Sequence, residues 1–421
     1  MSHTTETATE LEQFFLVFVN QDSSEDEYVE LELEGLVEAA GGTVVGATRQ
    51  RLDRPYKGHF VGSGKVDEIK AYAVEAGASG VIFDCELSGM QLRNLEEKLG
   101  IRVLDRTQLI LDIFATRART REGQLQVELA QLTYMLPRLM SVYTKFERQR
   151  GGIGMRGPGE TKLESDRRMV RIRIAKLTSD IEGVKQHRNQ QREGRRDQPH
   201  PFIAIVGYTS AGKSTLMNRI CQTDLLADAM PFATLDPTIR KVDRADGESF
   251  FLSDTVGFIR NLPTMLVAAF RATLEEVVQA DLLLHVVDVS QENWEIQSDV
   301  VQETIDALGG ENVPVLTVFN KIDALEDKVQ ARHLVSEWPD SVAISARTGE
   351  GMDDLFAMIS KMLAGRTSLI EALVPYDQAK LVENSYEFGR ILEKEYREDG
   401  IYLRAELVPE MRGRLMPYAI E

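Results

Sequence analysis

The chain has 421 residues, of which 43% are hydrophobic, so it can bury the cores of roughly two to four domains. Its net charge of -18 argues at first sight against a nucleic-acid partner, because like charges repel, but the charge is distributed unevenly. The two cysteines, Cys85 and Cys221, lie in different predicted units, which excludes a cysteine metal cluster and indicates a reducing compartment. No apolar run reaches the ~20 residues that cross a bilayer, and the acidic first ten residues lack the features of a secretory signal. We therefore expect a cytoplasmic protein without membrane insertion.

The first 105 residues alternate between strand and helix patterns. Strands are expected at 13–20, from 43, at 80–83 and at 102–104, and helices are expected at 24–40, 65–76 and 87–99. This alternation predicts a small parallel α/β domain, residues 1–105. The segment Gly62-Ser-Gly-Lys65 lacks the spacing of a phosphate loop, so we interpret it as a turn into a helix.

Residues 106–198 are predicted to form a basic helical hairpin. Leucines at 125, 129, 132 and 136 have helical spacing, and a second apolar series runs from 163 to 184. The Gly/Pro-rich segment 150–160 is expected to be the loop at the tip, and 186–200 a polar linker. Residues 138–196 hold 16 Lys/Arg against 7 Asp/Glu, a local balance of +9. Such a stripe is typical of proteins that bind a phosphate backbone, although a solvated helix face with ion pairs is the alternative.

The segment 207–214 reads Gly-Tyr-Thr-Ser-Ala-Gly-Lys-Ser and matches the P-loop pattern at every fixed position. A strand pattern precedes it and a helix pattern follows, which is the context that a phosphate loop requires. Lys213 would reach the β- and γ-phosphates of a nucleotide, and the Ser214 hydroxyl would bind Mg²⁺. The residues expected to contact the nucleotide here are Gly207, Tyr208, Thr209, Ser210, Ala211, Gly212, Lys213, Ser214 and Thr215.

Two segments after the P-loop are typical of a hydrolytic switch. Asp254-Thr-Val-Gly257 follows a strand pattern, so Asp254 would hold Mg²⁺ and the Gly257 N–H would sense the γ-phosphate. A threonine between the two motifs would close over the γ-phosphate and Mg²⁺; Thr234 is preferred and Thr238 is the alternative. The predicted catalytic residues are therefore Lys213, Thr234 and Gly257, and the predicted metal ligands are Ser214, Thr234 and Asp254. Phe258 stands where many GTPases place a water-orienting Gln, so intrinsic hydrolysis should be slow.

Asn320-Lys-Ile-Asp323 predicts that the base is guanine. The Asp323 carboxylate can accept hydrogen bonds from guanine N1–H and N2–H₂, a donor pair that adenine lacks. Asn320 would brace the loops, Lys321 would cover the base plane with its aliphatic stem, and the Ala346 N–H would face guanine O6. Ser345, Arg347 and Phe232 complete the predicted nucleotide contacts. The ligands implied are GTP or GDP with Mg²⁺.

The predicted fold class is α/β. A central P-loop GTPase domain with a mixed sheet flanked by helices occupies 199–367, after the N-terminal domain and the hairpin. Residues 368–421 contain a helix pattern at 378–398 and a strand pattern at 401–407, which predicts a small α+β domain at the C-terminal end.

The chain resembles the HflX family of translational GTPases over about residues 13–365. The resemblance rests on Phe232-Ala-Thr-Leu-Asp-Pro-Thr238, on Asp254-Thr-Val-Gly-Phe-Ile-Arg260 and on the Gly-rich segment 151–161. It implies a monomeric GTPase that binds the large (50S) ribosomal subunit and ribosomal RNA through the hairpin at 138–196, and that splits stalled or stressed ribosomes. In one departure, related potassium-stimulated GTPases carry Asn at the position of Ser210, which puts potassium activation in doubt.

Two other functions use the same parts. A ribosome-assembly GTPase would act on immature large subunits. A regulatory switch that does not bind RNA would use the hairpin to bind an acidic protein instead.

Overall fold

The computed structural model describes residues 11–20, 26–147, 158–196, 200–222, 230–235, 238–244, 249–263, 266, 276–363, 368–386, 388–407 and 409–420. The chain divides into two compact units, which are described separately. Unit 1 contains residues 1–182, 230–232 and 262–270, and unit 2 contains the remaining residues. Within the described ranges, no helix is long and apolar enough to cross a membrane.

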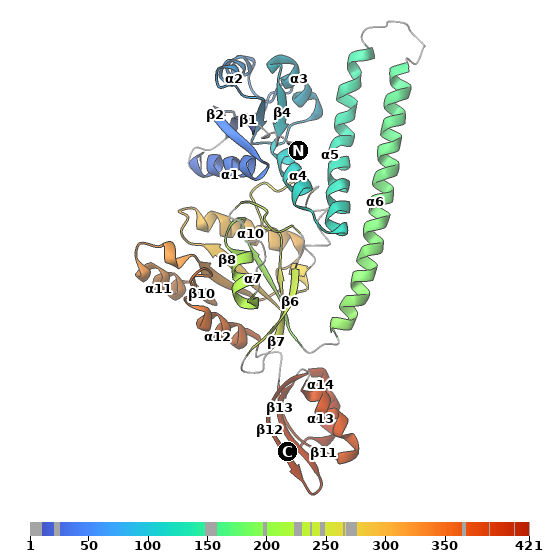
Figure 1. The fold of residues 1–421 in the computed structure, drawn as a ribbon, viewed down its shortest axis with the longest axis vertical. Helices are drawn as coiled ribbons and strands as arrows, with labels where there is room; N and C mark the ends of the chain where they lie inside the picture. Colours follow the sequence, from blue (N-terminus) through green and yellow to red (C-terminus); the bar gives the residue numbers. More distant parts are fainter. Residues whose placement is uncertain are drawn as a thin grey trace, which may run out of the picture. The chain divides into compact units, whose positions relative to one another are not determined.

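Unit 1 is built on a four-stranded parallel sheet in the order β2-β1-β3-β4 (Figure 1). The strands are β1 (Glu12–Asn20), β2 (Gly42–Arg51), β3 (Gly80–Phe83) and β4 (Arg102–Asp105). They alternate with α1 (Asp26–Ala39), α2 (Ser63–Glu75) and α3 (Gly89–Leu99). Strands β1, β3 and β4 bury mostly apolar side chains, as expected inside a parallel sheet, whereas the edge strand β2 is only partly buried.

A cluster of buried charges closes the carboxyl ends of β3 and β4. Asp84 follows β3 and accepts a hydrogen bond of 2.7 Å from Arg106, whose guanidinium also binds Glu32 of α1. Asp105 ends β4, is fully buried, and accepts from Arg138 at 3.2 Å and from the Leu87 N–H at 3.1 Å. Each carboxylate therefore has a guanidinium partner, which compensates the cost of burying its charge.

Three further helices complete unit 1: α4 (Arg106–Arg117), α5 (Arg121–Glu147) and α6 (Pro158–Arg196), of which α6 extends past the unit boundary at Glu182. Figure 1 shows α5 and α6 running side by side as the predicted antiparallel hairpin. Two sequence predictions were wrong at its boundaries. Helix α6 already begins at Pro158, because proline suits the first helical position, and it continues through most of the predicted linker 186–200. Of the Gly-rich tip predicted at 150–160, residues 150–157 lie outside the described residues and the rest belongs to α6.

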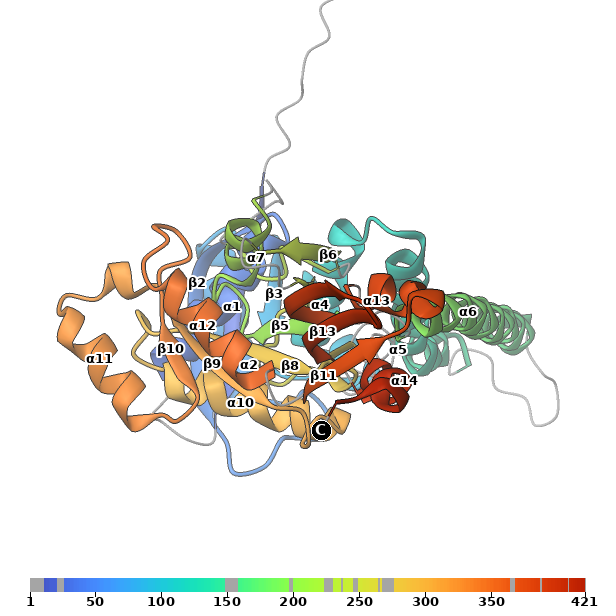
Figure 2. The ribbon, with the colours of Figure 1, turned by 90° about the horizontal axis from the view of Figure 1, so that it is seen from below.

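Unit 2 contains a six-stranded mixed sheet in the strand order β10-β9-β8-β5-β7-β6. Figure 2 shows the neighbouring strands β10, β9 and β8 side by side. The strands are β5 (Phe202–Gly207), β6 (Thr238–Asp243), β7 (Ser249–Asp254), β8 (Leu282–Asp288), β9 (Val315–Asn320) and β10 (Ser341–Ala343). All neighbours are parallel except β6 and β7. The helices are α7 (Lys213–Cys221), α10 (Trp294–Leu308), α11 (Lys328–Glu337) and α12 (Met352–Leu363), with a 3₁₀ turn at Ile322–Ala324. The predicted fold class is confirmed.

The end of the chain folds as a three-stranded antiparallel sheet, β11-β13-β12. Its elements are β11 (Ser368–Val374), α13 (Ala379–Ser385), β12 (Gly389–Arg397), β13 (Gly400–Leu407) and α14 (Pro409–Leu415), with 3₁₀ turns at Tyr376–Gln378 and Met416–Tyr418. The predicted helix 378–398 was half wrong, because its second half is β12. Pairing with β13 along the whole strand outweighs the helix propensity of its Glu and Lys residues.

Candidate functional site: a nucleotide pocket

The phosphate loop connects β5 to α7 at the carboxyl end of the sheet in unit 2. Two glycines make its path possible. A Cβ atom on Gly207 would lie 2.3 Å from the Val286 carbonyl oxygen, and one on Gly212, where φ is +97°, would lie 2.3 Å from Asn320 Nδ2. Ser210 adopts a left-handed φ of +61°, which a serine tolerates less well than glycine or asparagine. The loop thus leads into the N-terminus of α7, where the first N–H groups of a helix have no carbonyl partner within the helix, a geometry suited to phosphate.

The Lys213 side chain, 7% exposed, folds back along the loop. Its Nζ donates to the carbonyl oxygens of Tyr208 at 2.6 Å and Gly207 at 3.1 Å. Burial lowers the pKa of Lys213 to about 8, and the Asp254 carboxylate partly opposes this shift. A Cβ atom on Gly257 would lie 3.0 Å from this Nζ, so glycine lets the switch backbone approach the lysine. Lys213 and Gly257 therefore lie together, as a site for the terminal phosphate requires.

Ser214, Thr234 and Asp254 form one hydrogen-bonded group. The Ser214 hydroxyl lies 2.8 Å from Thr234 Oγ1 and donates to Asp254 Oδ2 at 2.7 Å. Burial raises the pKa of Asp254, while the charge of Lys213 opposes this. Its Oδ1 is buried and, among the described residues, accepts no hydrogen bond. Two hydroxyls and a carboxylate with an unsatisfied oxygen fit the all-oxygen environment that Mg²⁺ prefers. The alternative threonine, Thr238, begins β6 and pairs with Asp254 in strand register.

Backbone hydrogen bonds join Phe258, the residue after the Asp254–Gly257 motif, to the phosphate loop. Phe258 exchanges backbone hydrogen bonds with the loop: the Thr209 N–H donates to its carbonyl at 2.8 Å, and its N–H donates to Gly207 at 3.1 Å. The Phe258 ring is 1% exposed, so it is a core side chain. The Tyr208 hydroxyl accepts a hydrogen bond from the Arg260 N–H at 2.9 Å. Tyr208, which was predicted to contact the nucleotide, therefore also supports the segment 254–260.

The base-recognition segments meet around Asn320. Its Nδ2 donates to the Ala211 carbonyl at 2.8 Å, and its Oδ1 accepts from the Ala346 N–H at 3.0 Å. This one buried amide therefore joins the phosphate loop to the 345–350 loop.

Asp323 is held at both carboxylate oxygens. Oδ1 accepts from the Ser345 hydroxyl at 2.6 Å, and Oδ2 lies 2.5 Å from the Arg347 guanidinium. The Ser345 hydrogen bond and, to a smaller extent, the Arg347 charge lower the pKa of Asp323, so it stays ionised, the state that the predicted contact to guanine requires.

Some functional residues were not found from the sequence. Asp288, at the end of β8, binds the Lys321 ammonium at 2.6 Å and lies in register with Asn320. An aspartate at the carboxyl end of an apolar parallel strand was the available signal. His285, in the same strand, is buried, and its Nε2 has no hydrogen-bond partner among the described residues.

Two predicted nucleotide contacts, Phe232 and Thr215, take no part in the hydrogen bonds described above. The structure places Phe232 in unit 1, 2% exposed, with its ring edge-on to Phe114 at a centroid distance of 4.7 Å. Thr215 lies in the first turn of α7. Their roles as nucleotide contacts stay predictions.

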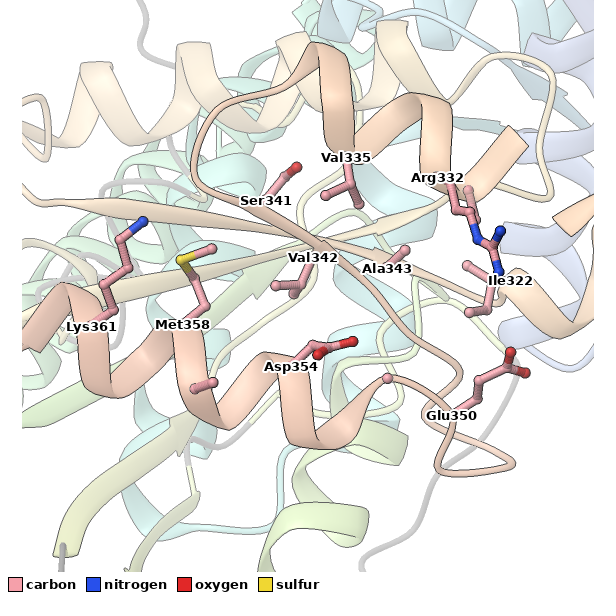
Figure 3. A pocket seen from close by; sticks show the side chains of 13 residues that line it. Ile322, Arg332, Val335, Ser341, Val342, Ala343, Glu350, Asp354, Met358 and Lys361 are labelled. Carbon is pink, nitrogen blue, oxygen red and sulfur yellow. The ribbon is translucent and has the colours of Figure 1, made fainter. Parts of the chain in front are cut away.

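A separate groove of about 620 Å³ runs along the edge strand β10 between α11 and α12 (Figure 3). Its floor is apolar, with Val342, Ala343 and Met358, and charged side chains line its ends. None of the predicted nucleotide contacts lines it.

Four family models match the chain in order: "GTP-binding GTPase N-terminal" at 27–115, "GTP-binding GTPase Middle Region" at 117–195, "50S ribosome-binding GTPase" at 202–321 and "HflX C-terminal domain" at 329–412. The GTPase HflX of Lacrimispora saccharolytica is 46% identical over 406 residues, which covers 96% of this chain and 95% of the relative. The chain belongs to the HflX family of GTPases. It is a GTP-hydrolysing enzyme.

Other HflX relatives match at similar levels. The GTPase HflX of Escherichia coli is 44% identical over 390 residues, covering 92% of each chain. A crystal structure of a GTP-binding protein from Sulfolobus solfataricus in complex with GDP is 25% identical, covers 83% of this chain and 98% of that chain, and has a TM-score of 0.45. The family models and the HflX relatives confirm the resemblance to the HflX family stated from the motifs.

Proposed function

We propose that this HflX-family GTPase acts in the cytoplasm, as a monomer, on the large ribosomal subunit, and that it dissociates stalled or stressed ribosomes. GTP hydrolysis is the switch that ends its stay on the subunit. The observation that carries the proposal is an exposed basic helix face in the same chain as the phosphate loop, the Asp254–Gly257 segment and the Asn320–Asp323 segment. The printed description "50S ribosome-binding GTPase" for the model at 202–321 supports the choice of subunit.

The basic face lies on α6. Arg168, Arg171 and Lys176 are exposed, so they can neutralise phosphates of ribosomal RNA. Two residues of the predicted stripe have structural partners instead. Arg173 forms two hydrogen bonds to Glu128 of α5, at 2.6 and 2.7 Å, and Arg138 is tied to Asp105 and the Leu87 carbonyl. The proposed RNA contact therefore rests on the exposed residues rather than on the whole count of basic side chains.

The proposed metal is Mg²⁺, held by Ser214, Thr234 and Asp254. When bound, it would neutralise charge on the β- and γ-phosphates. Lys213 would orient the terminal phosphate, and the Gly257 N–H would donate to it. Phe258 supplies no polar group, so the attacking water needs a group from the subunit or from another part of the chain. Hydrolysis should therefore be slow in the free protein and faster on its partner.

Sedimentation with 70S, 50S and 30S particles tests this proposal. With a GTP analogue, the protein should co-sediment with 50S particles and convert 70S particles to subunits, and GDP should weaken both effects. GTP turnover should rise with added 50S particles and fall steeply as salt increases. Binding only to immature large subunits would favour an assembly factor, and turnover unchanged by any particle would refute the proposal.

A matched pair of variants tests the helix face. Arg168→Glu with Arg171→Glu should reduce 50S binding about a hundredfold or more at moderate salt, because two phosphate contacts become repulsive. The basal GTPase rate should stay unchanged. Glu128→Gln with Arg173→Gln removes a charge pair without changing the net charge, and it should leave 50S binding near that of the unmodified protein.

A further inference from the structure

Arg219 connects the phosphate-binding helix to the loop that faces the base. It lies in the last turn of α7, the helix that begins with Lys213 and Ser214. Its Nε donates to the Ala346 carbonyl at 3.0 Å, and its Nη2 donates to the Arg347 carbonyl. One planar guanidinium thus binds two successive carbonyl oxygens, which fixes the orientation of both peptide groups more firmly than a single hydrogen bond would.

The 345–350 loop passes closely over this guanidinium. A Cβ atom on Gly349, where φ is +92°, would lie 3.8 Å from Arg219 Cζ. The loop is closed by the Gly349 N–H, which donates to Ser345 at 2.8 Å, and by the Ser345 N–H, which donates to Glu350 at 3.0 Å. The guanidinium therefore lies against a tight turn rather than against a free end of the chain.

Ala346 is consequently held on both sides. Its N–H points toward Asn320 Oδ1, and its carbonyl accepts from Arg219. The Ala346 side chain itself is 2% exposed, which leaves the residue little freedom to rotate. Asn320 fixes the loop relative to the phosphate loop, and Arg219 fixes the same residue relative to the phosphate-binding helix.

We infer that Arg219 is a positioning residue for guanine recognition: it holds the Ala346 peptide, whose N–H donates to Asn320 Oδ1 in this structure and would contact guanine O6 in the proposed base site. The inference rests on the proposed base site. Arg219 should affect the contact to O6 more than the contact of Asp323 with the N2 amino group, which the same loop supports only indirectly through Ser345 and Arg347. A purely structural role, for example a favourable charge at the C-terminal end of α7, would weaken all nucleotides equally.

The test combines two protein variants with two changes of the base. Arg219→Met keeps the aliphatic stem and removes both donors, and Arg219→Lys keeps the charge and one donor set. Arg332→Met, at an exposed arginine of α11, is the matched control. The Kd of each protein is measured for GDP, for 6-thio-GDP, in which sulfur replaces O6 as a poorer acceptor, and for IDP, which lacks the N2 amino group.

In the unmodified protein, 6-thio-GDP should bind about tenfold more weakly than GDP, the value of one hydrogen bond. In Arg219→Met this ratio should fall to about twofold, because the Ala346 peptide is no longer held in place. The IDP-to-GDP ratio should change less than the 6-thio-GDP ratio, Arg219→Lys should recover part of the O6 discrimination, and Arg332→Met should behave like the unmodified protein.

Equal losses for all three nucleotides in Arg219→Met would overturn the inference and assign Arg219 a structural role only. Retention of the full 6-thio-GDP ratio would overturn it as well. The proposed base site fails separately, if the unmodified protein binds ADP as tightly as GDP.

Discussion

Two sheets in this chain both have buried charged side chains at the carboxyl ends of parallel strands, and they differ in how those charges are satisfied. In unit 1, Asp84 follows β3 and Asp105 ends β4, and each binds a guanidinium, from Arg106 and Arg138. In unit 2, Asp254 ends β7, and its Oδ1 has no hydrogen-bond partner among the described residues. The carboxyl end of a parallel sheet is where α/β proteins commonly bind ligands. The comparison teaches that the first sheet end is closed by its own ion pairs, whereas the second keeps binding capacity for phosphate and metal.

The largest effect should come from removing Lys213, a buried cation at the open end. Lys213→Ala should weaken GTP and GDP binding by a thousandfold or more, about 4 kcal/mol, because the variant loses a charge-assisted contact to phosphate. The free energy of unfolding should change much less, since the hydrogen bonds of Lys213 to the described residues go to two carbonyl oxygens. Equilibrium binding of a fluorescent GDP analogue and urea denaturation measure the two quantities. Retained nucleotide affinity would contradict the assignment of this sheet end.

A substitution at the closed sheet end of unit 1 should lower the free energy of unfolding and leave nucleotide affinity unchanged. Asp84→Ala removes one partner of a buried pair whose side chains are both 3% exposed, so it should reduce the free energy of unfolding of unit 1 by about 3 kcal/mol. Nucleotide affinity should remain unchanged. Glu86→Ala is the control, because Glu86 lies 3.7 Å from Arg138 with its side chain 60% exposed, and it should cost under ~1 kcal/mol. Loss of nucleotide binding in Asp84→Ala would contradict the view that the buried charges of unit 1 serve stability alone.

A smaller effect is expected at the base. Asp323→Asn replaces an ionised acceptor by an amide that can satisfy only part of the guanine donor pair, so the preference for GDP over ADP should fall by about 2 kcal/mol. XDP, whose base offers an acceptor at position 2, should gain affinity relative to GDP. Competition binding with GDP, XDP and ADP measures the three values. An unchanged preference for GDP over ADP would remove Asp323 from the site.

At neutral pH the smallest effect is expected at His285, whose pKa is lowered to about 4 by burial and, secondarily, by the charge of Lys213. Because this value lies below the ~6.5 of an unfolded histidine, the folded state keeps its full stability above pH 6.5 and loses it as the pH falls toward 4. The slope contributed by His285 is up to about 1.4 kcal/mol per pH unit. His285→Gln should remove this part of the slope between pH 6.5 and 4.5 in urea denaturation. Identical pH dependence in both proteins would show that His285 is not buried as described.

The sequence predicted the phosphate and base motifs because they are local. The P-loop, Asp254–Gly257 and Asn320–Asp323 each combine fixed spacing with an adjacent strand, and strand pattern and register are readable from apolar runs. The partners of those motifs are distant in sequence and carry no periodic signal. Arg219 and Ala346 are separated by 127 positions, so only the folded structure shows that they bind.

The errors in the fold have a physical cause of the same kind. The segment Gly389–Arg397 has a helical composition, but its partner strand β13 decides its conformation. The end of α6 was predicted as a linker from its polarity, whereas the helix continues to Arg196. Tertiary pairing lies outside what a local pattern records, and polarity alone does not end a helix.

The close approach of Gly212 to the amide of Asn320 limits how this domain can be re-engineered. A Cβ atom on Gly212 would lie only 2.3 Å from Asn320 Nδ2. The residue before Lys213 must therefore stay small for the Asn320 amide to keep its position. A chimaera with the phosphate loop of another GTPase would keep the backbone path of that GTPase, but the loop would then face the Asn320 amide of this chain instead of the amide beside which it belongs. The two motifs, more than one hundred positions apart, should therefore be transplanted together as a single interchangeable part.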